Sequence, residues 1–459
     1  MGTSLFHEFE KNTAAVWKQK IQVDLNGLDY NESLLWKTTE DIVVKPFYTL
    51  EDRKDLKITA PKGTFSICQS IFIDDVRIAN SLAKNALERG ANSIQFIANS
   101  TFDFEVLLKR IDLESTKIFF KLQFLDEEFF KVLSQKTHSK NTFYQIDILG
   151  NLAENGNWFE SLSSDIQKFD AISKKVSNTI CIDASLYENA GAGIVQQLAY
   201  ALAQTNEYLE QLHKDAISNI HFIFSVRGNY FFEIAKLRAF KLLVQTLFKD
   251  NHYEATHIEL FVQPSARNKT MYDYNVNMLR TTSECMSAIL GGATSISNQS
   301  YDKTYHKSNE FGERIARNQL LILKKEAGFD EGHLLTEGSY YIESITHQLA
   351  QKALTLFKSI EKSGGFLKLL KEGSIQHKIV EKAGKEQAQF DAQELPLLGS
   401  NLHPNNKDRM LDQMELYPFV KQRNIKTLIV PITRKRLAEA YEKERLENEK
   451  KNLKRFTKQ

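Results

Sequence analysis

The chain has 459 residues, 42% of them hydrophobic, and 60 lysines and arginines against 58 aspartates and glutamates give a formal charge of +2. This length suffices for one large domain with extensions, or for two to three ordinary domains. The charge balance argues against nucleic acid as a partner, and no apolar run approaches the roughly 18 residues of a membrane span. Three cysteines far apart and a start without a basic, apolar leader predict free thiols and a cytoplasmic location.

The first fifty residues carry too little apolar content for a core of their own. Residues 4–20 are predicted to form an amphipathic helix, whose apolar face carries Phe6, Phe9, Val16 and Trp17. Residues 34–49 hold two short β-prone runs around a polar Thr-Thr-Glu-Asp turn, which is typical of a hairpin. Residues 1–50 are therefore expected to be an arm that packs either on the main domain of the chain or on a partner.

Eight short β-prone runs follow, with segments of helical periodicity between them. The runs are 65–73, 93–98, 117–122, 143–149, 178–183, 221–226, 257–263 and 294–298. Their repeat of roughly 30 residues is that of a βα unit, so eight units predict an α/β fold, a closed (β/α)8 TIM barrel, within residues 51–400. An open doubly wound sheet is the alternative, but it usually has a glycine-rich loop after its first strand. The segment "SICQSIFIDD" has no such loop.

Helical periodicity continues after the eighth run. Two long helices are predicted within 311–328 and 344–365, and residues 401–459 are expected to form a helical tail with many charges of both signs. Glu439 with Lys443, and Glu447 with Lys451, have the i,i+4 spacing that supports a solvated helix. We favour this interpretation over an anionic partner for the basic end of the chain.

The loop "DASLYENAGAG" (183–193) stands between the fifth run and a helix that begins near Ile194. Its Gly-Ala-Gly resembles the start of a dinucleotide fingerprint, but Gln196 replaces the third glycine. We interpret Gly191 and Gly193 as permitting a tight entry into the helix. Asp183 lies at the end of a strand, where barrels keep their chemistry. It is either a general base or a group that caps a turn or pairs with a basic neighbour, and the second role is favoured.

No recognised catalytic motif accompanies this loop. The P-loop, H-E-x-x-H, C-x-x-C and G-x-S-x-G patterns are absent from the sequence. Arg227, after the sixth run, is a candidate clamp for an anionic group on the same face as Asp183. His221 and His257 each open a strand, at the barrel end away from the catalytic face, and are predicted to be structural.

Several longer segments resemble the barrel domain of methylmalonyl-CoA mutases. They are "FFEIAKLRAFKLL" (231–243), "MLRTTSECMSAILGGATSIS" (278–297), "RIARNQLLILKKEAG" (314–328), "GSYYIESITHQLAQKA" (338–353) and "NAGAG" (189–193). They follow the family's order within a match that runs from about residue 15 to 400. The resemblance implies a barrel that holds an acyl-CoA with its CoA tail along the axis. In the family, adenosylcobalamin on a separate C-terminal domain supplies a radical to that acyl-CoA.

The sequence departs from the family at positions that carry chemistry. The D-x-H-x-x-G motif, whose histidine ligates cobalt in the family, does not occur. Ser185 and Leu186 stand where catalytic members keep a Tyr-His pair that grips the substrate carbonyl, and leucine cannot form a hydrogen bond. Thr294 stands in place of a family glutamine. Thr336 and Glu337 replace a Trp-Gly pair beside the cofactor face.

This pattern resembles the small, or beta, subunit of heterodimeric bacterial methylmalonyl-CoA mutases. The resemblance implies a chain without catalytic residues whose arm wraps a large catalytic subunit, and that partner binds adenosylcobalamin and acyl-CoA. One alternative is the active barrel subunit of a split acyl-CoA mutase whose cobalamin domain is a separate chain. Another is an acyl-CoA-binding barrel, since Ser265 and Arg267 fall where the family contacts the CoA tail.

Overall fold

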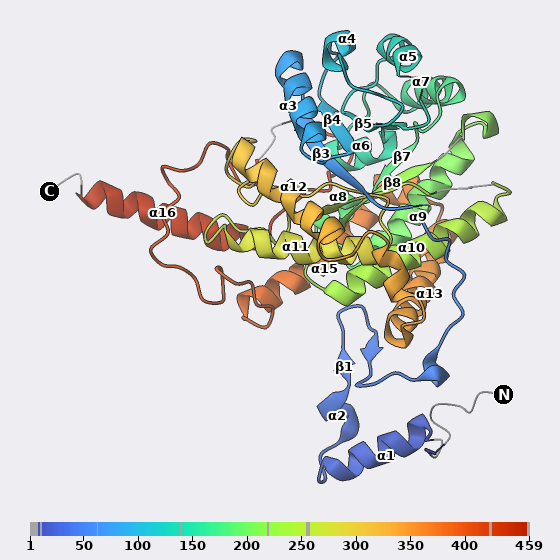
Figure 1. Cartoon of the computed structure of the whole chain (residues 1–459), viewed down its shortest axis with the longest axis vertical. Helices are drawn as coiled ribbons and strands as arrows, with labels where there is room; N and C mark the ends of the chain where they lie inside the picture. Colours follow the sequence, from blue (N-terminus) through green and yellow to red (C-terminus); the bar gives the residue numbers. More distant parts are fainter. Residues whose placement is uncertain are drawn as a thin grey trace.

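An eight-stranded parallel sheet, closed into a barrel, forms the centre of the molecule (Figure 1). The computed structural model describes residues 8–9, 12–61, 63–137, 139–217, 220–253, 258–421 and 425–456. The strands are β3 (Ser66–Phe72), β4 (Ser93–Ala98), β5 (Lys117–Leu122), β6 (Thr142–Gln145), β7 (Cys181–Asp183), β8 (His221–Val226), β9 (Leu260–Pro264) and β10 (Ser295–Ile296). They pair in the order β6-β5-β4-β3-β10-β9-β8-β7, and a parallel bridge between Ile146 and Ile180 joins the two ends. The predicted (β/α)8 barrel is confirmed.

Helices alternate with the strands and surround the barrel. Between the strands lie α3 (Val76–Glu88), α4 (Phe104–Leu107), α5 (Glu127–Lys136), α6 (Ile148–Asn155), α7 (Leu162–Lys175), α8 (Ser185–Asn189), α9 (Ile194–Gln211), α10 (Tyr230–Asp250) and α11 (Val276–Leu290). After β10 come α12 (Glu310–Lys325), α13 (Tyr340–Lys362), α14 (Phe366–Lys371) and α15 (Ser374–Asp391). Among the helices of the described ranges, none is long and apolar enough to cross a bilayer.

The fourth predicted run, 143–149, is wrong in its second half. Strand β6 ends at Gln145, and α6 begins at Ile148 because Asp147 caps it. The Asp147 Oδ1 atom accepts a hydrogen bond from the Gly150 N–H at 2.7 Å. A short apolar run fits a buried strand and a buried helix equally well, so periodicity alone does not separate them.

The N-terminal arm extends away from the barrel (Figure 1). It consists of α1 (Ala14–Asp24), α2 (Tyr30–Leu34), β1 (Trp36–Lys37) and β2 (Val43–Val44). The predicted hairpin is confirmed, since β1 and β2 pair antiparallel. Its turn contacts the barrel layer, because the Glu40 carboxylate accepts a hydrogen bond of 3.0 Å from the Val195 N–H at the start of α9.

The helix of the arm differs from its prediction. It begins at Ala14, where Thr13 caps it, rather than at residue 4. Phe6 lies outside the described residues. Helix α1 buries none of its residues, and Trp17 is 54% exposed. The arm is thus fixed to the chain at its hairpin, while its first helix leaves an apolar surface uncovered.

Residues 425–438, here called the strap, cross the barrel face at which the strands end. The Ile432 N–H donates to the Ala153 carbonyl at 2.7 Å, and the Lys435 N–H donates to the Asn189 carbonyl at 2.9 Å. The Leu437 N–H donates to the Arg267 carbonyl at 2.8 Å. These acceptors follow three different strands, so the strap joins the loops of half the barrel rim.

Helix α16 (Glu439–Phe456) follows the strap and extends to one side of the molecule (Figure 1). The predicted pair of Glu439 and Lys443 is present at 2.7 Å. The helix is not solvated all round, however, because Glu442 and Glu449 are buried. Their carboxylates accept hydrogen bonds from the backbone N–H groups of Met271 and Met410. One face of α16 therefore holds the loop between β9 and α11 and the segment between α15 and the strap in place.

Candidate functional site

Asp183 ends strand β7 and is held between two cations. Its Oδ2 atom lies 2.7 Å from the Lys121 Nζ and 3.5 Å from an Arg434 nitrogen of the strap. Burial alone would raise the pKa of Asp183, but Lys121 and Arg434 outweigh it and hold that pKa well below its usual range. A carboxylate so firmly ionised is a weak general base. The structure thus agrees with the interpretation that Asp183 pairs with basic neighbours.

Ser185 and Leu186 open α8, two residues after Asp183, and both are buried. The Ser185 hydroxyl donates to Asp183 and accepts a hydrogen bond of 3.1 Å from Arg434. Leu186 packs in the main hydrophobic core. The two positions that resemble the family's Tyr-His pair are therefore occupied by a hydroxyl bound to the strap and by a core side chain.

The glycines of the same loop serve the entry into α9, which begins at Ile194 as predicted. Gly191 has a φ of +98°, a conformation that side chains rarely adopt. A Cβ atom there would lie 2.6 Å from the Cβ of Ala383 and 2.8 Å from the guanidinium carbon of Arg267. Glycine is required at this position by a close approach within the chain.

Ser265 and Arg267 follow β9 and contact the chain itself. Arg267 is 3% exposed, and its Nε lies 2.7 Å from the Glu386 carboxylate of α15. Its Nη1 donates to the Lys435 carbonyl of the strap at 2.8 Å. The Ser265 hydroxyl accepts a hydrogen bond from the Arg267 N–H at 3.0 Å. Both side chains are thus already bonded within the protein.

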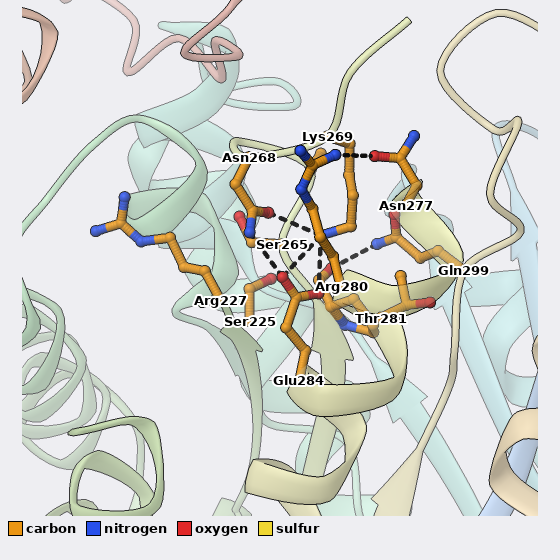
Figure 2. Close-up of polar contacts among 12 residues, drawn as sticks. Ser225, Arg227, Ser265, Asn268, Lys269, Asn277, Arg280, Thr281, Glu284 and Gln299 are labelled. Atoms are coloured by element: carbon orange, nitrogen blue, oxygen red, sulfur yellow. Dashed lines mark hydrogen bonds and ion pairs between the residues drawn. The ribbon is translucent and has the colours of Figure 1, made fainter. Parts of the chain in front are cut away.

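Arg227 shares the same acidic partner as Arg267. Its guanidinium pairs with Glu386 and lies 2.9 Å from the Glu188 carboxylate of α8. In Figure 2 the Arg227 side chain extends away from the polar cluster around Lys269. The predicted anion clamp therefore has two carboxylates of its own chain as partners.

The sequence reasoning missed the polar cluster that Figure 2 draws between the β9 loop and α11. The Lys269 Nζ lies 2.7 Å from Glu284, Asn268 donates to the same carboxylate at 2.7 Å, and Arg280 donates to Asn277 at 2.8 Å. Burial lowers the pKa of Lys269 and raises that of Glu284. The one available signal was an acidic residue within the apolar face of a predicted helix. The cluster fixes the loop that carries Ser265 and Arg267.

Thr294 and Thr336, which the sequence predicts to replace family residues, lie outside the loop of Asp183. Thr294 precedes β10 and accepts a hydrogen bond from the Leu260 N–H at 2.7 Å. Thr336 donates to the Leu290 carbonyl at 3.1 Å, beside the turn that leads into β10. The expectation that Thr336 lies beside the cofactor face is wrong, because this bond holds it near the barrel end where the strands begin. His221 opens β8 and is buried at that same end, whereas His257 lies outside the described residues.

Side chains fill the axis of the barrel. The inward-facing middle layer consists of Cys68, Phe119, Phe143, Cys181, Ile223 and Phe261. The ring of Phe119 lies 5.2 Å from that of Phe143 and 4.9 Å from that of Phe261, between centroids. A polar layer below contains the ion pair of Lys117 and Glu259. Such layers make a packed core rather than a channel.

Comparison with known proteins decides the family. Residues 97–457 match the family model described as methylmalonyl-CoA mutase. The methylmalonyl-CoA mutase small subunit of Porphyromonas gingivalis is 32% identical over 489 aligned residues, which cover 97% of this chain and 78% of that protein. The chain belongs to the methylmalonyl-CoA mutase family. The family resemblance seen in the sequence is confirmed, and the chain is a homologue of the small subunit.

Two large subunits of this family or its relatives match less of the chain. The methylmalonyl-CoA mutase large subunit of the same organism is 30% identical, over 56% of this chain and 36% of that protein. The 2-hydroxyisobutanoyl-CoA mutase large subunit of Aquincola tertiaricarbonis is 26% identical, over 69% of this chain and 60% of that protein. The three relatives have similar sequence identity to this chain. The small subunit differs from the two large subunits in the share of this chain that its alignment covers.

The family implies a cobalamin-dependent complex, but the residues of this chain do not fit that cofactor. The strap crosses the barrel face on which cobalamin would bear and places Arg434 over Asp183. The sequence has no D-x-H-x-x-G motif to ligate cobalt.

Proposed function

We propose that this chain is the non-catalytic small subunit of a heterodimeric, adenosylcobalamin-dependent methylmalonyl-CoA mutase. The large subunit binds cobalamin and acyl-CoA and interconverts methylmalonyl-CoA and succinyl-CoA. The observation that carries the proposal is the filled axis. The CoA tail of a substrate would have to displace Phe119, Phe143 and Phe261, and these rings are almost fully buried. Removing even one buried ring costs about 3–5 kcal/mol.

The arm supplies a surface for the partner. Trp17 is 54% exposed, Val23 71% and Leu28 66%. Apolar side chains grouped on one exposed segment mark protein–protein contact sites, and tryptophan is enriched among the residues that dominate binding energy. The hairpin holds the base of the arm through Glu40, so α1 is presented outward from a fixed point.

Co-purification with the longer homologue from the same cell tests this proposal. We expect a one-to-one complex that contains one cobalamin, carried by the large subunit. Two cobalamins per pair, or cobalamin bound by the isolated chain, would contradict it.

The second candidate is the active barrel of a split mutase whose cobalamin domain is a separate chain. The match of 69% of the chain to a 2-hydroxyisobutanoyl-CoA mutase large subunit favours it. Ser185 and Leu186 count against it, because leucine cannot replace a hydrogen-bonding histidine. The two candidates differ in the protein that co-purifies: a full-length mutase for the first, a small cobalamin-binding protein for the second.

A further inference from the structure

A cavity of about 570 Å³ opens between α5 and α7, at the barrel end where the strands begin. It lies outside the seam between β6 and β7, where Ile146 and Ile180 form a parallel bridge and the Tyr144 N–H donates to the Asn178 carbonyl at 2.9 Å. Its volume is in the range of pockets that hold small organic ligands. The strap and the Asp183 ion pair lie at the opposite end of the barrel, so this cavity is separate from the site described above.

The rim of the cavity is positively charged. Lys131, Lys140 and Lys175 line it, against a single acidic residue, Glu127. Across the ranges that the structure describes, the ammonium groups of these three lysines have no hydrogen-bond or ion-pair partner. Nearby Lys136 and Lys174, by contrast, pair with carboxylates at 2.8 and 2.7 Å. Unpaired like charges around a concave surface raise the local potential and attract anions.

The wall of the cavity on the side of α7 is apolar. Ala171 and Val176 are partly exposed in it, and the buried rings of Phe130 and Tyr144 pack 4.8 Å apart between centroids. Burial raises the pKa of Tyr144 to about 12, so its hydroxyl stays neutral and bonded to Thr137. Such a surface suits a flat ring rather than a bare ion.

One polar atom in the cavity has no partner. Thr142 is 1% exposed and lines the cavity, and its Oγ1 makes no hydrogen bond to any described residue. A buried hydroxyl without a partner costs free energy that a bound ligand would recover. The apolar wall, the unpaired hydroxyl and the three lysines therefore describe one ligand with a ring and an anionic group.

We propose that this cavity binds an organic phosphate with an aromatic body, of the nucleotide class. The ring lies against the apolar surface of Ala171 and Val176, a polar group of the ligand bonds to the Thr142 hydroxyl, and the phosphates lie among Lys131, Lys140 and Lys175. Two sources carry this chemistry, a free nucleotide and the adenosine diphosphate part of coenzyme A. The site does not depend on the proposed role as a small subunit.

Calorimetric titration of the full chain with ADP tests the site, with coenzyme A and inorganic phosphate titrated separately. We expect saturable binding of ADP, of coenzyme A, or of both. The triple variant Lys131→Ala, Lys140→Ala and Lys175→Ala should weaken it by about tenfold or more. The matched control, with Lys249, Lys325 and Lys371 changed to alanine, alters the net charge equally and should leave binding unchanged.

A second variant tests the shape of the cavity without changing its charge. Ala171→Phe, on α7, places a ring in the cavity and should weaken binding as strongly as the triple variant. Stronger binding of coenzyme A than of ADP would identify the larger molecule as the occupant, and the reverse would identify a free nucleotide. No saturable binding of either, equal loss in the lysine control, or inorganic phosphate binding as tightly as ADP would overturn the proposal. Thermal melting of each variant confirms that it folds.

Discussion

The barrel and the arm use aromatic side chains in opposite ways. In the barrel, Phe119 and Phe261 are fully buried and pack together on the axis. In the arm, Phe9 is 72% exposed and Trp17 54% exposed. The contrast teaches that this chain packs the axis of its barrel as a core and leaves large apolar side chains exposed on its arm. Under the proposed function, the chain contributes to the complex by binding the large subunit with its exposed arm.

The largest effect is expected from opening the axis. Phe119→Ala should lower the free energy of unfolding by about 3–5 kcal/mol, because it removes a buried ring from a packed layer. The affinity for the large subunit should not change. Chemical denaturation and a binding titration measure the two quantities. Phe72→Ala, at a ring that is 52% exposed on β3, is the matched control and should cost little. A loss of partner affinity in Phe119→Ala would remove the contrast between barrel and arm.

A change in the arm should have the opposite result, a loss of partner affinity without a loss of stability. Trp17→Ala should weaken binding of the large subunit by about 2–4 kcal/mol, roughly 30- to 1000-fold in Kd, and leave the stability of the isolated chain nearly unchanged. Leu279→Ala, at a residue of α11 that is 69% exposed, should change neither quantity. Equal losses of affinity in the two variants would mean that the arm has no special part in assembly.

A buried histidine, His221, is expected to make the barrel less stable in acid. Burial lowers the pKa of His221 to about 4, although Glu259 opposes the shift, and no described group bonds either ring nitrogen. The unfolded chain binds this proton near pH 6.5, so the stability contributed by neutral His221 is complete above that pH and is lost as pH falls towards 4. The loss should reach about 3 kcal/mol.

Denaturation curves at several pH values check this prediction. His221→Gln should flatten the dependence between pH 6.5 and 4, whereas His403→Gln, at an exposed position, should leave it unchanged. An unaltered slope in His221→Gln would place the acid sensitivity elsewhere.

A smaller loss of stability is expected when the charge of Arg434 in the strap is removed. Arg434→Met leaves Asp183 with Lys121 as its remaining cation and should cost about 1–3 kcal/mol at pH 7, since the pair is partly open to solvent. The pKa of Asp183 is lowered in the folded state. Its contribution is therefore present above the unfolded pKa, about 3.9, and is lost as pH falls below that value.

The difference between the wild type and Arg434→Met should thus shrink below about pH 4. Urea denaturation at pH 7 and pH 3 measures it. Arg110→Met, at an exposed arginine, is the control and should be neutral at both values. A difference that grows in acid would show that Arg434 acts by something other than its charge.

The sequence predicts the barrel but not the state of its site. Parallel strands buried on both faces appear as apolar runs, and their regular spacing identifies the (β/α)8 repeat. The contact of Arg434 with Asp183 joins residues from distant parts of the chain, so no local pattern indicates it. Phe119, Phe143 and Phe261 meet on the axis only because the register of three strands brings them to one layer. The expectation that Ser185 and Leu186 replace a Tyr-His pair comes from the sequence, whereas the packing that fills the axis does not.

Turnover by the isolated chain tests the central claim most directly. The purified chain, supplied with adenosylcobalamin and methylmalonyl-CoA, should form no succinyl-CoA, and addition of the large homologue should restore turnover. Formation of succinyl-CoA by this chain alone would contradict the account, because it would require a substrate where Phe119, Phe143 and Phe261 are packed together.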